Sequence, residues 1–147
     1  MKHNIVSNFR PHGQGLGKLF GSLEADIMTL IWERQRASAR DIFEGLRDQG
    51  QRLSYGATKT VLDRLVKKQV LMRDLDGNQY TYYALLNRED YTRSAIREII
   101  DGLFAGFGSP VYAQFLDRIQ SSSPEQLDQL TELINAAEAR KQNPTTT

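Results

Sequence analysis

The sequence has 147 residues, a length typical of one compact domain or of one domain with a smaller accessory segment. Apolar residues make up 39% and charged residues 25%, which indicates a globular protein and excludes collagen-like and wholly disordered classes. There is no cysteine, so disulfides, thiolate metal sites and cysteine nucleophiles are excluded. No apolar run approaches the roughly 18 residues of a membrane-spanning helix. The opening residues contain no apolar signal segment either, so we expect a cytoplasmic protein without direct membrane insertion.

The formal net charge is only +1, but the charges are unevenly distributed. Residues 1–83 contain 13 Lys or Arg against 9 Asp or Glu, whereas residues 84–147 contain 6 against 9. Positive charge is densest over residues 52–73, where six basic side chains accompany a single acidic one, Asp63. Such a block is typical of a surface that binds a polyanion. On charge alone, a solvated helix face explains it equally well.

Residues 1–21 are rich in glycine and polar residues without a sustained period, so we expect an N-terminal arm over 1–15 and an arm or ordered loop up to 21. We expect a helix to follow, with Ser22 as its N-cap and its end near Arg34. Its apolar residues recur at helical spacing. They are Leu23, Ile27, Leu30 and Ile31.

Two further helices are expected after short connections. Ser38 is the N-cap of the second, with Asp41 three residues on as a short capping box and Gly50 as its end. Ser54 begins the third. The inward stripe expected for the third helix comprises Ala57, Val61, Leu62, Leu65 and Val66.

The pattern then changes to that of a β-hairpin. Residues 70–75 and 79–84 are β-prone, and Asp76-Gly77 between them is a strong hairpin signal. Three helices followed by a hairpin are the order of a winged helix-turn-helix. The sequence therefore predicts a mainly α-helical protein with a winged-helix domain over residues 16–84.

The C-terminal part reads as helical. Asn87 caps a long helix, Gly106 and the stretch 108–110 interrupt it, helical character resumes over 111–119, and Ser123 caps the last helix.

We expect residues 85–141 to form a helical dimerisation domain and 142–147 a frayed tail. This region carries more apolar surface than so short a segment can hide within one chain. Its aromatic residues could also line an effector pocket, although a dimer core requires the same residue types. The candidate dimerisation residues are Leu103, Phe104, Phe115, Leu116, Ile119, Leu130, Leu133 and Ile134.

The third helix carries the side chains that a reader of DNA needs. Short polar side chains at an exposed helix start suit base edges in the major groove, and cations further along suit phosphates. Gly56 is small enough for close approach to a duplex, or simply for tight helix packing. Asn78 at the hairpin tip could contact a neighbouring backbone, although a polar tip is expected in any case. The candidate DNA-binding residues are Ser54, Tyr55, Gly56, Thr58, Lys59, Thr60, Arg64, Lys67, Lys68 and Asn78.

Several segments in this order resemble the penicillinase-repressor (BlaI/MecI-type) family of transcriptional regulators. The resemblance covers about residues 16–140 and implies a homodimeric repressor that binds a palindromic operator through one winged helix per half-site. Its C-terminal helices would form the dimer. The segments that carry the resemblance are Leu23–Met28, Ile31–Glu33, Ser54-Tyr55, Lys59–Lys68 and Tyr80–Tyr82.

The sequence departs from the family pattern at several positions. Gly56-Ala57 stands where members commonly carry two threonines, and Gln69 stands where a helix-ending glycine is usual, so we expect this helix to end differently. In the methicillin and penicillin repressors, a membrane sensor protease pathway leads to cleavage at an Asn-Phe bond, and Gln114-Phe115 aligns there. Such cleavage or an unknown effector are the alternative off-switches. The cysteine pairs of the copper-responsive branch are absent.

Other chemistry has little support in the sequence. His3 and His12 are the only histidines and lack carboxylate neighbours, so we expect no metal site, no cofactor and no enzyme activity. Trp32 is expected to pack the first helix against the wing. The sequence predicts a DNA-binding repressor with double-stranded DNA as its partner. The alternative is a winged-helix protein–protein interaction module.

Overall fold

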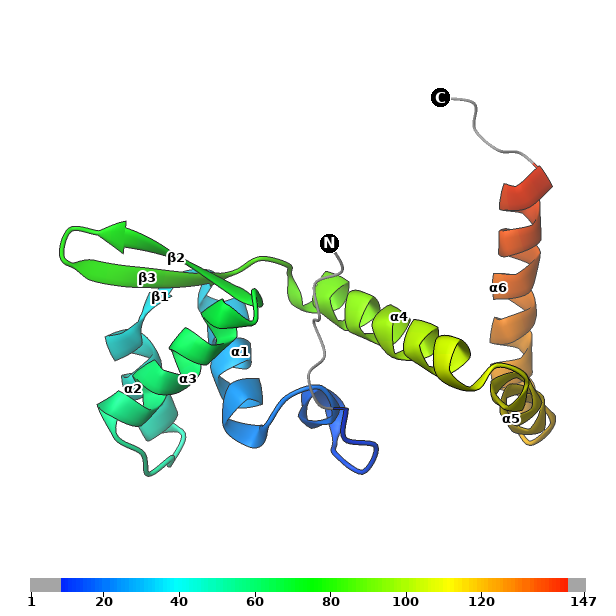
Figure 1. Ribbon diagram of the computed structural model, residues 1–147, viewed down its shortest axis with the longest axis horizontal. Helices are drawn as coiled ribbons and strands as arrows, with labels where there is room; N and C mark the ends of the chain where they lie inside the picture. Colours follow the sequence, from blue (N-terminus) through cyan, green and yellow to red (C-terminus); the bar gives the residue numbers. More distant parts are fainter. Residues whose placement is uncertain (1–8, 143–147) are drawn as a thin grey trace. The chain divides into compact units, whose positions relative to one another are not determined.

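The computed structural model describes residues 9–142 (Figure 1), so His3 and the end of the expected tail lie outside the described residues. The chain forms two compact units, which divide between Gly102 and Leu103. Within residues 9–142, no helix combines the length and the apolar character needed to cross a membrane.

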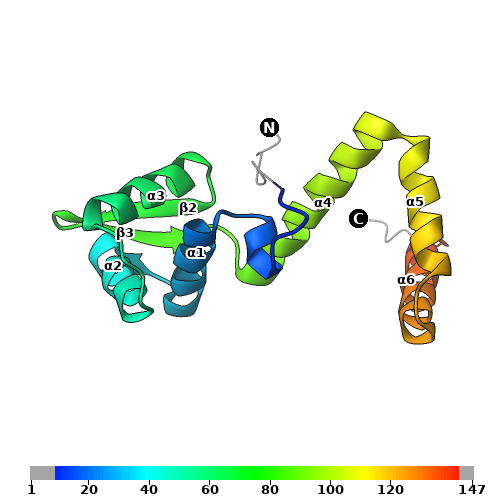
Figure 2. The ribbon, with the colours of Figure 1, turned by 90° about the horizontal axis from the view of Figure 1, so that it is seen from below.

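The first unit contains a short 3₁₀ helix, the helices α1 to α3, most of α4 and a small antiparallel sheet (Figures 1 and 2). The strand order is β1-β3-β2, and the hairpin of β2 and β3 extends beyond the helices in Figure 1. This is a winged helix-turn-helix, so the predicted fold class is confirmed. The elements are η1 (Gly15–Lys18), α1 (Ser22–Arg34), β1 (Ala37–Ser38), α2 (Ala39–Asp48), α3 (Tyr55–Lys67), β2 (Leu71–Asp76), β3 (Gln79–Ala84) and the beginning of α4 (Arg88–Phe107).

Two of the expected helix caps are confirmed. The Ser38 hydroxyl accepts the amide of Asp41 at 3.1 Å, and the Asp41 carboxylate accepts the amide of Ser38 at 2.9 Å. The Ser38 hydroxyl also donates to the Asp41 carboxylate, at 2.7 Å. The bonds that the Ser38 amide and hydroxyl donate to this carboxylate lower the pKa of Asp41. The Ser54 hydroxyl accepts the amide of Ala57 at 3.1 Å and so begins α3. Each cap satisfies an amide that has no partner within its helix.

The cap of α1 differs from the prediction. The N-cap is Gly21, and Ser22 is already the first helical residue. The Glu24 carboxylate accepts the Gly21 amide at 3.3 Å, which is half of a capping box. Because glycine has no side-chain oxygen, the other half of the box, a cap side chain that accepts the Glu24 amide, is absent.

The core lies between the three helices and the sheet. One correction concerns α3, where Ala57 is exposed and Thr58 is fully buried, so the inward stripe begins one residue later than predicted. The remaining stripe is as predicted, except that Val66 is only half-buried. The fully buried large side chains are Ile27, Met28, Ile31, Ile42, Leu46, Thr58, Leu62, Leu65, Leu71 and Tyr82.

The sheet contains a strand that the sequence pattern did not reveal. The two residues of β1 pair with β3, with Ala37 opposite Tyr82. A two-residue strand has no alternation to detect. The hairpin itself is as predicted, and Gly77 has φ 62° at the first central position of its two-residue turn. That conformation favours glycine, as in a type II′ turn.

The first part of α4 belongs to the first unit. Tyr91 is buried, and its ring lies 5.0 Å from that of Phe20 and 5.7 Å from that of Trp32. Burial raises the pKa of Tyr91. Trp32 donates its indole N–H to the Leu86 carbonyl at 2.9 Å, so it packs α1 against the chain that follows β3 rather than against the wing. The two compact units therefore divide inside α4.

The second unit consists of the end of α4, α5 (Ser109–Gln120) and α6 (Pro124–Gln142). The break falls at Gly108, with φ 63°, whereas Gly106 lies within α4 and doesn't interrupt it. The expected caps at Asn87 and Ser123 are confirmed. The Asn87 side-chain oxygen accepts the Asp90 amide at 2.8 Å, and the Ser123 hydroxyl accepts the Gln126 amide at 3.4 Å. Neither α5 nor α6 has a buried residue.

Gln69 has φ 61°, so α3 does end in the left-handed conformation without a glycine, contrary to our expectation. The amides of Gln69 and Val70 bond to the carbonyls of Val66 and Leu65 at 2.9 and 3.0 Å. These two bonds form a Schellman motif, in which the left-handed position strongly favours glycine.

We expect Gln69→Gly to stabilise the protein by about 1 kcal/mol, because it relieves the side-chain strain at this position. Chemical denaturation measures the free energy of unfolding, and Gln49→Gly at the end of α2, where φ is −81°, serves as the control. A loss of stability on Gln69→Gly would contradict the assignment.

Candidate nucleic-acid interface

The exposed face of α3 brings most of the predicted DNA-binding residues together. Burial of the opposite face fixes the rotation of the helix. The same face includes Ala57, which sequence reasoning placed in the core. The predicted residues exposed on α3 and at its cap are Ser54, Tyr55, Gly56, Lys59, Thr60, Arg64 and Lys67.

The beginning of α3 is held by an aromatic contact with α2. The ring of Tyr55 meets that of Phe43 edge-on at 5.9 Å, and the guanidinium of Arg47 lies 5.9 Å from the same Phe43 ring. Tyr55 still exposes 41% of its surface. A Cβ on Gly56 would meet only the Ser54 hydroxyl, at 3.9 Å, which is an ordinary contact. Gly56 therefore leaves the start of the helix accessible and does not serve close packing of one helix on another.

Thr58 doesn't lie on this face. It is fully buried, and its hydroxyl donates to the Ser54 carbonyl at 3.2 Å. The expectation that Thr58 contacts a base is therefore corrected. Apolar periodicity alone missed it, because threonine is polar in composition but β-branched in shape and fills a core position like valine.

The cations of α3 fall into two pairs. Within residues 9–142, Lys59 and Lys67 have no acidic partner within ion-pair distance. Arg64 and Lys68 instead share the Glu24 carboxylate of α1, at 3.6 and 3.2 Å. Lys68 is half-buried in this arrangement. The free pair is thus better placed to contact a nucleic acid than the pair held by Glu24, a distinction that the sequence didn't reveal.

The wing has mixed character. Asn78 is exposed at its tip, as expected. Arg73 pairs with Asp63 of α3 at 3.0 Å and lies over the ring of Tyr80 at 4.3 Å, which ties the wing to α3. Leu75, opposite Tyr80 in the register, exposes 64% of its surface. The wing therefore offers apolar and polar contacts more than positive charge.

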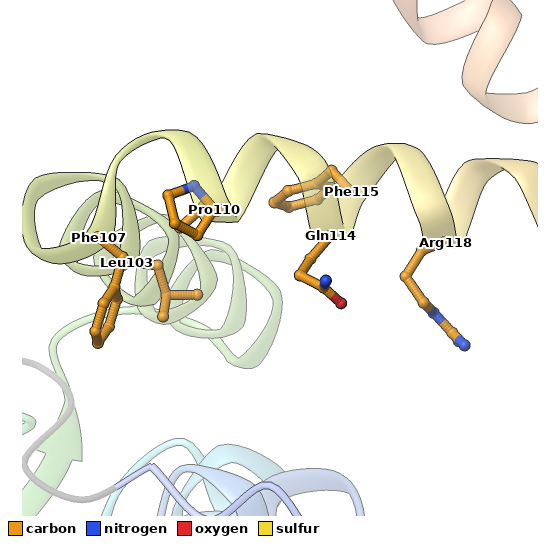
Figure 3. A pocket seen from close by; sticks show the side chains of 7 residues that line it. Leu103, Phe107, Pro110, Gln114, Phe115 and Arg118 are labelled. Carbon is orange, nitrogen blue, oxygen red and sulfur yellow. The ribbon is translucent and has the colours of Figure 1, made fainter.

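The second unit carries an apolar groove of about 560 Å³. Figure 3 shows Leu103, Phe107, Gln114 and Arg118 extending to one side of the ribbon. Phe104 lies 4.8 Å from the ring of Tyr112 and 6.1 Å from that of Phe115. The other predicted dimerisation residues are also solvent-accessible here, with Ile119 and Leu130 half-buried and Leu116, Leu133 and Ile134 exposed.

The described residues contain no cluster of three or more His, Asp or Glu side chains suited to a metal ion. His12 is exposed, and His3 lies outside the described part of the chain. Gln114 and Phe115 lie within α5, exposed but in regular helical conformation.

Three packed helices, a hairpin wing and an exposed third helix define a winged helix-turn-helix protein. The penicillinase repressor family matches residues 20–136. Because this match spans most of the chain, the protein belongs to the penicillinase repressor family, and the resemblance drawn from its motifs is confirmed.

Its relatives are of modest identity but cover most of both chains. The methicillin resistance regulatory protein MecI of Staphylococcus aureus (strain N315) is 25% identical over 114 residues, which cover 78% of this chain and 91% of that protein. The penicillinase repressor of Staphylococcus aureus is 22% identical over 112 residues, or 76% and 87% of the two chains. Among solved structures, the DNA-binding domain of the repressor BlaI is 24% identical, covering 49% of this chain and 87% of that one, with a TM-score of 0.44.

We expect Thr58→Val to change the free energy of unfolding by no more than about 1 kcal/mol, because the Ser54 carbonyl keeps the Thr58 amide as a donor at 3.1 Å. Affinity for a duplex selected in vitro on the wild-type protein should stay the same. Thermal unfolding and fluorescence anisotropy measure the two quantities. A specific loss of affinity without loss of stability would restore Thr58 to the interface.

Proposed function

We propose that this protein is a transcriptional repressor that binds double-stranded DNA through α3 and the wing, as a homodimer on a palindromic operator. The observation that carries the proposal is the exposed face of α3, where short polar residues precede the unpaired Lys59 and Lys67. A helix with this face fits the major groove, and cations along it neutralise phosphates. Membership of a family whose relatives are named as repressors supports it further. Repression would follow from occlusion of the promoter.

A second copy of the chain is the occupant that we propose for the apolar face of the second unit. Leu116, Leu133 and Ile134 expose 59, 65 and 54% of their surface, and no residue of α5 or α6 is buried. An isolated chain would leave these side chains in water at a cost of about 25 cal/mol per Å² of apolar surface. A symmetric partner buries the same stripe on both copies and would present two recognition helices to two half-sites.

The off-switch that we propose acts on this dimer. A cut at Gln114-Phe115, or an effector bound nearby, would weaken the association of the second units. Since the bond lies within α5, a protease requires that this helix first opens locally. Mass spectrometry of the protein from induced cells separates the two routes: a cut chain supports the protease pathway, and an intact chain supports an effector.

We expect Lys59→Ala to weaken binding to the selected duplex by about 1–3 kcal/mol while affecting random duplex less, because Lys59 lies in the first half of α3, near the base-reading end. Lys67→Ala should weaken both equally and lower the salt slope by about one unit, as for a phosphate contact. Fluorescence anisotropy over a range of salt concentrations measures both.

Lys141→Ala, in the last turn of α6, is the matched control and should change neither affinity nor slope. Unchanged binding in both α3 variants would contradict the proposed interface. It would favour the alternative, a winged-helix module for protein partners.

We expect Leu133→Asp to weaken dimerisation by at least about tenfold, because it places a charge within the apolar face. Sedimentation equilibrium measures the dissociation constant of the full chain. Leu85→Asp, which is 57% exposed in the first unit, is the matched control and should leave the dimer unaffected. A wild-type protein that stays monomeric, or a Leu133→Asp variant that dimerises as tightly, would refute the assigned face.

A further inference from the structure

A second cavity lies in the first unit and shares Arg64 with the exposed face of α3. It measures about 700 Å³ and lies between the loop before α1, the first turn of α1 and the second half of α3. This volume is in the range of small-molecule sites. Its apolar lining is Leu19, Leu23 and Val61, and its charged lining is Arg10, Glu24, Arg64 and Lys68.

The loop over residues 10–18 is built to hold Arg10 in place. The Arg10 amide donates to the Lys18 carbonyl at 2.8 Å, and the Arg10 carbonyl accepts the Gly13 amide at 3.0 Å. A Cβ on Gly13 would lie only 2.5 Å from the Gly17 carbonyl oxygen, so this closure requires glycine. The Arg10 guanidinium comes within 3.8 Å of the position that a Cβ on Gly21 would occupy, at the start of α1.

The charges in the cavity are not balanced. One oxygen of Glu24 meets both Lys68 and Arg64, and its other oxygen accepts the Gly21 amide. Within residues 9–142, the Arg10 guanidinium has no carboxylate or carbonyl partner within bonding distance. Three cations therefore line a cavity that contains one carboxylate, that of Glu24, whose side chain is 10% exposed.

We propose that this cavity binds a small organic anion, a carboxylate or a phosphate monoester with an apolar body. Arg10 and Lys68 would hold the anionic group, and Leu19, Leu23 and Val61 would contact the body. A carboxylate or phosphate there supplies the negative charge that would balance the cations. Hydrogen bonds between oppositely charged groups are stronger than those between neutral groups. The proposal stands independently of DNA binding. Because Arg64 lies on α3 and Lys68 is its C-cap, an occupant competes with Glu24 for two side chains at the end of that helix.

The test is a calorimetric titration of the full chain with benzoate and with phenyl phosphate, and with benzyl alcohol as the neutral control. We expect saturable binding of at least one anion and none of the alcohol. Arg10→Gln should weaken that binding by about tenfold, through loss of a charge-assisted contact. Glu24→Gln should strengthen it, because it removes the competing charge but keeps an oxygen for the Gly21 amide.

Arg97→Gln is the matched control, since Arg97 is exposed on α4 and has no ion-pair partner among residues 9–142. It should bind the anions as the wild type does, and circular dichroism checks that each variant is folded. Arg10 lies on a surface loop, so the Arg10→Gln arm decides the matter even if Glu24→Gln unfolds.

Three results would overturn the proposal: no saturable binding of either anion, equal binding of benzyl alcohol, or anion binding that Arg10→Gln leaves unchanged. Where neither anion binds but Arg10→Gln weakens binding to duplex DNA, the cavity contacts the DNA backbone and the small-anion site is refuted. Weaker DNA binding by Arg10→Gln without anion binding would refute the anion site but leave the proposed function standing. Anion binding by a protein that does not bind DNA would support the anion site and contradict the proposed function.

Discussion

Burial of one stripe of α3 is the constraint on which the rest of the structure depends. Thr58, Val61, Leu62 and Leu65 pack into the core of the first unit, and this fixes the rotation of the helix about its axis. Every side chain between them is then directed outward. The buried stripe thus decides which polar and basic groups can contact a partner. A rotation of the helix by one residue would bury Ala57 and expose Thr58 instead.

The core also determines how freely the cations of α3 can act. Glu24 lies in the first turn of α1, where it caps the helix and holds Arg64 and Lys68. The Glu24 carboxylate thus accepts a hydrogen bond at the start of α1 and also neutralises part of the positive charge at the end of α3. Lys59 and Lys67 lie beyond its reach, so the face proposed to meet DNA keeps part of the positive charge of the segment.

The two units differ in whether they bury a hydrophobic core of their own. The first unit closes its core with Phe20, Trp32 and Tyr91, which anchor the beginning of α4. The second leaves apolar side chains such as Leu133 exposed along its helices. A helical segment without a core of its own is stable when another surface covers it, so we propose a second copy of the chain as its cover.

Much of the fold could be predicted because its signals are local. The serine caps at Ser38 and Ser54 and the Asp-Gly turn act within a few residues, and all were identified from the sequence. The pairing of β1 with β3, the contact of Tyr91 with Phe20, and the capture of Lys68 by Glu24 join residues far apart in sequence, and no local pattern contains them. The candidate site shows the same difference between local and long-range signals. Its helix was predicted from the sequence, but tertiary contacts decide which of its basic side chains lack an acidic partner.

DNA binding by the exposed face of α3 is the proposal on which the proposed function rests. The most direct test is an amide-resolved NMR titration of the full chain with a random-sequence duplex at low and at moderate salt. We expect shifts concentrated at Tyr55–Lys67 and at the wing tip, which diminish steeply as salt rises, since phosphate contacts release counterions. Shifts confined to α5 and α6, or no shifts at low salt, would contradict it.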